Sequence, residues 1–177
     1  MKTWKTISSK KILDHKRLTV FEDQVELPNG QVTDYVHFGN DKGSVAIIAI
    51  NDEGKILLQK EYNYPPNQWL FQFPGGRIDN NEHPEAAAIR ELSEEAKITG
   101  KFEFLSKYFV DNRKRRDEQF VFVCTQLASK KGVQDLEEVF EEHWLSPAEI
   151  NELILAGQLN TAASLAAWMQ YSILRSQ

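Results

Sequence analysis

Three glutamates within five positions form a dense group of potentially reactive side chains in this chain. They are Glu91, Glu94 and Glu95, and Arg90 precedes them directly. Like charges three or four residues apart on a helix repel one another, at a cost of a few tenths of a kcal/mol per pair. A hard cation such as Mg²⁺ binds carboxylate oxygens and would turn this repulsion into attraction. The cluster therefore indicates either a solvated helix face or a divalent-cation site.

The residues around this cluster predict a helix over 84–97. Pro84 suits the first helical position, and His83 would be a weak N-cap. At 100° per residue the three glutamates share one side of this helix. The opposite side is expected to be buried, and it carries Ile89, Leu92 and Ala96.

Two glycines come shortly before the helix, in the run Pro74-Gly75-Gly76 that follows a strand-like segment. Glycine lets the backbone adopt unusual conformations or come close to a ligand or metal. A plain turn explains the glycines alone. It does not explain why they stand at a fixed distance from the carboxylates.

The complete spacing resembles the signature of a known family. Gly76 is followed after five residues by Glu82, and after seven more by the run Arg90-Glu91-Leu92-Ser93-Glu94-Glu95-Ala96-Lys97-Ile98. This resembles the Nudix box, which is glycine-x5-glutamate-x7-Arg-Glu-apolar-x-Glu-Glu-x-Gly-apolar. Every defined position matches except one, because Lys97 stands where the family has glycine. A glycine there would end the helix with a positive φ.

The resemblance implies a fold, a reaction and a cofactor. Nudix hydrolases form an α/β/α sandwich with a mixed sheet, and they cleave a pyrophosphate linkage in a nucleoside diphosphate derivative. They bind Mg²⁺ or Mn²⁺, and water attacks phosphorus. By motif position the metal ligands are Glu91, Glu95, the Gly75 carbonyl and Glu94. Arg90 is expected to orient the glutamates, and Glu82 to assist through water or structure.

The N-terminal half is most similar to the ADP-ribose pyrophosphatase branch of that family. This implies that residues 1–40 form an antiparallel strand region that helps to build a homodimer, and that residues 41–177 form the Nudix hydrolase domain. It also implies a small nucleotide diphosphate substrate whose base stacks on an aromatic ring. Trp4 and Phe21 are candidates for that ring, with burial in the fold as the alternative, and Gly76 is a candidate for backbone contact with the substrate.

Several positions depart from this branch. Asn63 and Gln72 stand where the branch usually has an arginine and a glutamate. Glu118 best matches the loop glutamate that serves as base or as an extra ligand. These departures leave the pyrophosphatase chemistry as the expectation and open the question of which substrate is used.

A basic run occupies the polar segment between two strand-like stretches near the middle of the chain. It reads Arg113-Lys114-Arg115-Arg116. A solvated loop is one interpretation. The other is an anion clamp, because arginine holds phosphate groups in a bidentate manner. In that case Arg113 and Arg116 would bind substrate, and the substrate would carry more phosphate than ADP-ribose does.

The elements that must position these residues follow an α+β order. Alternation around Pro28-Asn29-Gly30 predicts a hairpin over 18–38. Apolar runs predict a second hairpin over 44–62 whose first strand is buried on both faces. Further strands are expected at 69–73, 101–110 and 118–127. The capping box Ser146-Pro147-Ala148-Glu149 starts a helix, and a last helix is expected over 161–174.

Composition limits the class of protein. The formal net charge of −5 disfavours nucleic acid as a partner. The single cysteine, Cys124, excludes a disulfide within the chain and favours a reducing, cytoplasmic setting. No run approaches the roughly 18 apolar residues of a membrane span. Two alternatives to the enzyme remain: a catalytically inactive Nudix-fold nucleotide-binding or regulatory protein, and an enzyme of this fold that acts on capped or triphosphate-ended RNA.

Overall fold

The computed structural model describes residues 2–16, 18–39, 42–130 and 140–175. These residues form nine strands and three helices. The strands are β1 (Lys5–His15), β2 (Leu18–Glu26), β3 (Val32–Phe38), β4 (Ser44–Ala49), β5 (Ile56–Asn63), β6 (Gln68–Gln72), β7 (Ile98–Phe109), β8 (Glu118–Ser129) and β9 (Phe140–Leu145). The helices are α1 (Pro84–Ala96), α2 (Pro147–Leu155) and α3 (Ala162–Arg175). None of the helices in these ranges combines the length and the apolar character that a bilayer crossing requires.

The chain divides into two compact units. The first contains residues 1–41 and 109–118, and the second contains residues 42–108 and 119–177. In the first unit, β1, β2 and β3 form an antiparallel sheet with β2 in the middle. The predicted hairpin is confirmed, because Leu27 and Gly30 close the turn between β2 and β3.

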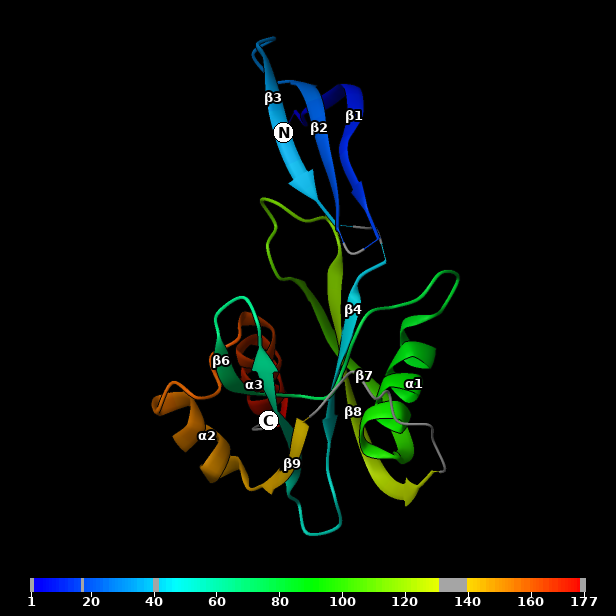
Figure 1. The fold of residues 1–177 in the computed structure, drawn as a ribbon, viewed down its shortest axis with the longest axis vertical. Helices are drawn as coiled ribbons and strands as arrows, with labels where there is room; N and C mark the ends of the chain where they lie inside the picture. Colours follow the sequence, from blue (N-terminus) through cyan, green and yellow to red (C-terminus); the bar gives the residue numbers. More distant parts are fainter. Residues whose placement is uncertain (1, 17, 40–41, 131–139, 176–177) are drawn as a thin grey trace. The chain divides into compact units, whose positions relative to one another are not determined.

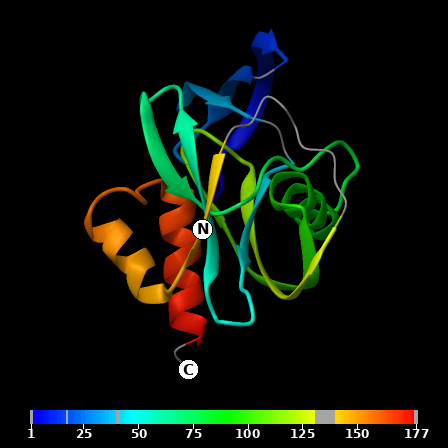
Figure 2. The same ribbon diagram turned by 60° about the horizontal axis from the view of Figure 1, so that its bottom comes forward.

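The second unit is an α/β/α sandwich. One sheet has the order β4-β8-β7 and the other has the order β6-β5-β9. β4 pairs with β8 in parallel, whereas β5 pairs with β6 and β9 in antiparallel fashion, so the arrangement is mixed. Helix α1 lies on one side of these strands, and α2 and α3 lie on the other (Figures 1 and 2).

Alternation along the central strands explains the two cores. In β4, Val45 and Ile47 pack on the α1 side, while Ala46 and Ile48 pack on the α2 and α3 side. Because both faces are covered, nearly every residue of this strand is apolar. The expectation of a strand buried on both faces is confirmed.

The prediction that residues 44–62 form a hairpin of two paired strands is wrong. The turn at Asn51–Gly54 forms, but β4 and β5 share only an isolated bridge between Ile50 and Ile56 and then enter different sheets. The reason is long-range pairing: β4 takes β8 as its parallel partner, more than 70 residues further along the chain. A local apolar pattern holds no information about that partner. β1 and β9 were not expected as separate strands.

Candidate functional site

Helix α1 carries the glutamate cluster and is anchored through its small residues. Ala87, Ala88, Leu92 and Ser93 are its buried residues. The expected apolar face is therefore only partly right, since Ile89 and Ala96 are half-buried. The face that packs on β4 is the one that carries Ala87, Ala88 and Leu92. The N-cap His83 makes no side-chain cap hydrogen bond, as its residue type predicts.

Helix α1 ends at its C-cap residue Lys97, the one position where the sequence departs from the Nudix box. Lys97 adopts the left-handed conformation, with φ 54° and ψ 32°. The helix therefore ends as the family glycine would end it. A non-glycine residue in this conformation costs about 1–2 kcal/mol, so the fold keeps the geometry at the expense of some stability.

Two carboxylates of α1 converge on the glycine pair. The Gly75 amide donates to Glu95 Oε2 at 3.1 Å. A Cβ built on Gly76 would lie 2.3 Å from Glu91 Oε1 and 2.7 Å from Glu91 Oε2. The structure thus brings together Gly75, Gly76, Glu91 and Glu95, which the sequence had placed in one site.

The glycine pair is itself held by strand β4. Val45 donates its amide to the Gly76 carbonyl at 2.8 Å, and Ile47 donates to the Pro74 carbonyl at 2.8 Å. A Cβ on Gly75 would lie 2.1 Å from the Val45 carbonyl oxygen. Only glycine fits this close backbone approach, so a rigid strand fixes one wall of the site.

Arg90 connects the remaining carboxylates. Its guanidinium donates to Glu82 at both oxygens, with N–O distances of 3.0 Å. It also donates to Glu91 Oε1 at 2.9 Å, to Glu94 Oε2 at 3.1 Å and to the Arg77 carbonyl at 2.9 Å. Arg90 thus contacts three of the glutamates, and its orienting role stays a prediction.

The contact between Arg90 and Glu82 shifts the pKa of both side chains. The hydrogen bond from Arg90 lowers the pKa of Glu82, against the opposing effect of burial. The hydrogen bond to Glu82 likewise raises the pKa of Arg90, again against burial. Glu82 also accepts the Asp79 amide at 2.9 Å. It therefore ties the loop before the helix to Arg90, which is a structural contribution.

The donor set suits a hard divalent cation in its chemistry. Glu82, Glu91, Glu94 and Glu95 supply carboxylate oxygens, the ligand type that Mg²⁺ and Mn²⁺ prefer. Within the described ranges, however, no three acidic, histidine or cysteine side chains are drawn together at metal-binding distances. The structure shows Glu82, Glu91 and Glu94 bonded to Arg90, and Glu95 bonded to Gly75.

Asn63 on β5 and Gln72 on β6, which depart from the pattern of the branch, each contact Glu61. Gln72 Nε2 donates to Glu61 Oε2, and Asn63 Nδ2 donates to the Glu61 carbonyl at 3.1 Å. Both residues are thus engaged with the same neighbour on β5. The sequence identified these positions but not Glu61, because the pairing of β5 with β6 brings Gln72 to it; the Asn63 contact lies within β5.

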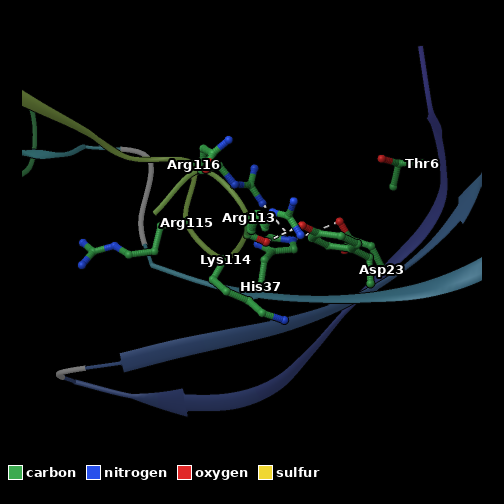
Figure 3. Close-up of a pocket in the computed structure, with 9 residues that line it drawn as sticks. Thr6, Asp23, His37, Arg113, Lys114, Arg115 and Arg116 are labelled. Atoms are coloured by element: carbon green, nitrogen blue, oxygen red, sulfur yellow. Dashed lines mark hydrogen bonds and ion pairs between the residues drawn. The ribbon is translucent and has the colours of Figure 1, made fainter. Parts of the chain in front are cut away.

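The other predicted site residues belong to the first unit. Arg113 and Arg116 line a pocket in that unit (Figure 3). Trp4 packs edge-on against Tyr35, with ring centroids 5.9 Å apart, and Phe21 stacks on His37 at 5.3 Å. Glu118 is half-buried at the start of β8. The roles expected for Trp4, Phe21 and Glu118 stay predictions.

Sequence reasoning missed Asp23, Tyr35 and His37, which line the same pocket as the basic run. No local signal identifies them, because they stand on β2 and β3, more than 70 residues before the loop that they face. Strand alternation puts Asp23 on the same face as Phe21, but it does not distinguish Asp23 from other polar residues of β2.

Comparison with known proteins gives two family matches. Residues 41–168 match the family described as NUDIX domain. Residues 4–36 match the family described as nucleoside diphosphate sugar hydrolase N-terminal domain. Together the two matches cover most of the chain.

Three individual proteins are similar to this chain. A Bacillus subtilis protein named ADP-ribose pyrophosphatase is 36% identical over 97 residues, which is 55% of this chain and 52% of that protein. A Bacillus methanolicus protein named methanol dehydrogenase activator is 37% identical over 91 residues, or 51% and 49% of the two chains. The chain thus matches about half the length of these relatives. A crystal structure titled ADP compounds hydrolase superposes with a TM-score of 0.90 at 21% identity, over 99% of this chain and 96% of that one, and shows the fold.

Proposed function

Because the chain belongs to the NUDIX family, with residues 41–168 matching its domain, we propose that it is a metal-dependent hydrolase of nucleoside diphosphate derivatives. It cleaves the pyrophosphate linkage of a substrate of the ADP-ribose or nucleotide-sugar type, and water attacks phosphorus. The observation that carries this proposal is the convergence of Glu91 and Glu95 on Gly75 and Gly76. The names of the N-terminal family match and of the B. subtilis relative support the substrate class.

Each residue of the site has a proposed role. Glu91, Glu94 and Glu95 would hold Mg²⁺ or Mn²⁺, with the Gly75 carbonyl as a further ligand. When bound, the cation neutralises phosphate oxygens and lowers the pKa of water. Arg90 holds the carboxylates in place, as its bonds to Glu91 and Glu94 support. Glu118 is proposed as the base or as an extra ligand.

A homodimer is proposed as the working state. Strand β1 is exposed along its whole length, and it is an edge strand that pairs only with β2 in the described sheet. Ile7, Ile12 and Leu13 on this strand are 46–51% exposed. Exposed apolar side chains on an edge strand are a liability unless a partner covers them. A second copy of the chain is the partner we propose.

A second candidate function is a regulatory, catalytically inactive protein of this fold. The observation in its favour is the B. methanolicus relative, whose name is methanol dehydrogenase activator. Against it, all four residues of the motif are in place: Arg90 bonds Glu91 and Glu94, and Glu95 accepts the Gly75 amide. The two functions are separated by whether purified protein turns over a nucleotide substrate.

The test of the enzyme proposal is a Glu95→Gln variant. Glutamine keeps the size of the side chain and still accepts the Gly75 amide, but it removes the negative charge that a cation requires. We expect Mg²⁺-dependent turnover of ADP-ribose or a nucleotide sugar to fall by about 100-fold or more, with an unchanged thermal midpoint. Turnover is measured as phosphate released by a coupled phosphatase.

Glu85→Gln is the matched control. Glu85 lies in the first turn of the same helix and is exposed. It loses the same charge without touching the glycine pair, so its activity should match that of the unaltered protein. Full activity in Glu95→Gln would overturn the metal assignment. Silence of the unaltered protein on every nucleotide substrate would favour the regulatory function.

A further inference from the structure

A basic pocket of about 310 Å³ lies in the first unit, and the proposed hydrolysis makes no use of it. The loop 112–116 forms one side of it, and strands β2 and β3 form the other (Figure 3). Ligand clefts have volumes from roughly 300 Å³ upward, so this pocket has room for more than a single ion. Four consecutive basic side chains line it, and Asp23 is its one carboxylate.

The loop that carries the basic residues is a built structure. The Asp111 carbonyl accepts the amides of Lys114 at 3.1 Å and Arg115 at 2.8 Å. Strand β3 holds the loop from the other side: the Phe38 amide donates to the Lys114 carbonyl at 2.8 Å, and the Tyr35 hydroxyl donates to the Arg113 carbonyl. All the loop atoms in these bonds belong to the backbone. These bonds fix the backbone of the loop, so the fold sets the points from which its basic side chains project.

Arg115 has a structural task. Its guanidinium binds both oxygens of Asp117, a side chain that is buried. The hydrogen bond with Asp117 also raises the pKa of Arg115, against the effect of burial. Figure 3 shows Arg115 extending away from Asp23 and His37. Asp117 thus balances the charge of Arg115, which leaves Arg113, Lys114 and Arg116 as the basic residues considered for anion binding.

Arg116 is positioned by a pair of residues on β2 and β3. His37 Nε2 donates to Asp23 Oδ2 at 3.0 Å, so the Arg116 guanidinium nitrogen 3.4 Å from the same histidine nitrogen makes a contact there and not a second hydrogen bond. The Arg116 guanidinium also lies 5.8 Å from the centroid of the Phe21 ring, which stacks on His37. Burial opposes ionisation of Asp23, but hydrogen bonds from Ser9 and His37 and the charge of Arg116 lower its pKa below the usual value. Asp23 is therefore ionised at neutral pH and helps to hold Arg116 in place.

We propose that this pocket binds a phosphate group, with Arg113 and Arg116 as the anion-binding side chains and the Asp23–His37 pair as the positioning element for Arg116. Arg113, Lys114 and Arg116 together exceed the single charge of Asp23, so the pocket attracts an anion. Guanidinium groups donate two parallel hydrogen bonds to phosphate. The net charge of −5 on the whole chain disfavours nucleic acid in favour of a small phosphorylated ligand.

The phosphate can come from two sources. One is a further phosphate on the nucleotide substrate, as the basic run itself predicts. The other is free inorganic phosphate or a separate phosphorylated metabolite. The binding proposal rests on the geometry of the first unit alone, and only the choice between the sources depends on the proposed hydrolysis.

The first experiment measures binding of inorganic phosphate by isothermal titration, without any turnover. The Arg113→Ala variant is the cleanest change, because the loop is anchored through the Arg113 backbone, which alanine keeps. We expect it to bind phosphate about 10- to 100-fold more weakly than the unaltered protein, as the loss of a charge-assisted hydrogen bond implies. Arg113→Lys, which keeps the charge but not the bidentate geometry, should fall in between.

Lys10→Ala is the matched control, because Lys10 is an exposed residue of β1 in the same unit and outside the pocket lining. Its phosphate affinity should be unchanged. Equal affinity in Arg113→Ala and the unaltered protein would overturn the proposal, as would the absence of binding in the unaltered protein. Thermal melting of each variant checks that the fold is kept.

The second experiment distinguishes the sources with ADP-ribose and ADP-ribose 2′-phosphate as a matched pair. If the substrate supplies the phosphate, Arg113→Ala raises KM for the phosphorylated substrate alone. If free phosphate is the ligand, KM is unchanged for both substrates while phosphate binding is lost. Failure of the proposed hydrolysis would leave the titration result untouched, so the two proposals fail separately.

Discussion

Alanine at positions 75 and 76 is expected to damage the protein in different ways, although the two glycines are neighbours. A Cβ in Gly76→Ala meets the Glu91 carboxylate, whose nearest oxygen would lie at 2.3 Å. A Cβ in Gly75→Ala meets the Val45 carbonyl oxygen at 2.1 Å. The first obstacle is the end of a flexible side chain, and the second is the backbone of a central strand.

The size of each effect follows from what must move. The Glu91 carboxylate can withdraw by about 1 Å to restore an ordinary contact, and a displacement of that size at a reacting centre costs on the order of 100-fold in rate. The fold itself is barely affected. In Gly75→Ala the strand must shift, which costs about 3 kcal/mol or more. For a protein of this length that is a drop of roughly 6–12 °C in Tm.

The assay pairs two measurements on each variant. Turnover of a nucleotide sugar or ADP-ribose with Mg²⁺ gives kcat/KM, and thermal melting followed by circular dichroism gives Tm. Gly76→Ala should lose activity and keep its Tm within about 2 °C. Gly75→Ala should have a lower Tm, and its activity should fall in proportion to the fraction of protein that is folded.

Gly54→Ala serves as the control, because nothing lies within 4 Å of its added Cβ. It measures the cost of alanine at a positive φ without any contact in the site. Activity of Gly76→Ala within about threefold of the unaltered protein would refute the reasoning, since the Glu91 carboxylate would then need no fixed place.

Three further outcomes are expected elsewhere in the second unit. Lys97→Gly should raise the free energy of unfolding by about 1 kcal/mol, measured by urea titration, because glycine adopts φ 54° without strain; no gain would contradict a strained helix end. Cys124 should react with a thiol reagent only after unfolding, because it is fully buried and burial raises its pKa to about 11. Arg90 lowers the pKa of Glu82 below 4.5 in the fold, so the stability from this ion pair is present above pH 4.5 and is lost as the pH falls below that value. The Tm deficit of Glu82→Gln should therefore be largest near neutral pH and shrink in acid.

Local patterns predicted the parts of the structure that depend on near neighbours. The capping box is one: Ser146 and Glu149 bond each other's backbone as expected, and α2 begins at Pro147. The Nudix-like spacing is another, because α1 and the glycine pair lie within about 20 residues of each other in the sequence. Gly75 and Glu95 therefore meet as predicted.

Features that depend on distant partners could not be read from the sequence. The parallel pairing of β4 with β8 joins Ser44 to Gln119. The pocket in the first unit joins Asp23 to Arg116, on segments that are more than 90 residues apart. Each segment alone is an ordinary polar or apolar stretch, and the chemistry appears only when the fold brings them together. The turned face of α1, with Ala87 buried and Ile89 half-buried, has the same origin, since the packing partner decides which side is covered.

The most direct test of the central claim is hydrolysis in water enriched in ¹⁸O. The unaltered protein is incubated with Mg²⁺ and with ADP-ribose or a nucleotide sugar, and the masses of the products are determined by mass spectrometry. The account predicts a nucleoside monophosphate and a sugar phosphate, with one ¹⁸O atom in the phosphate group of one of the two. Cleavage that leaves both phosphates unlabelled, or that leaves the nucleoside diphosphate intact, would contradict attack of water on phosphorus at the pyrophosphate linkage.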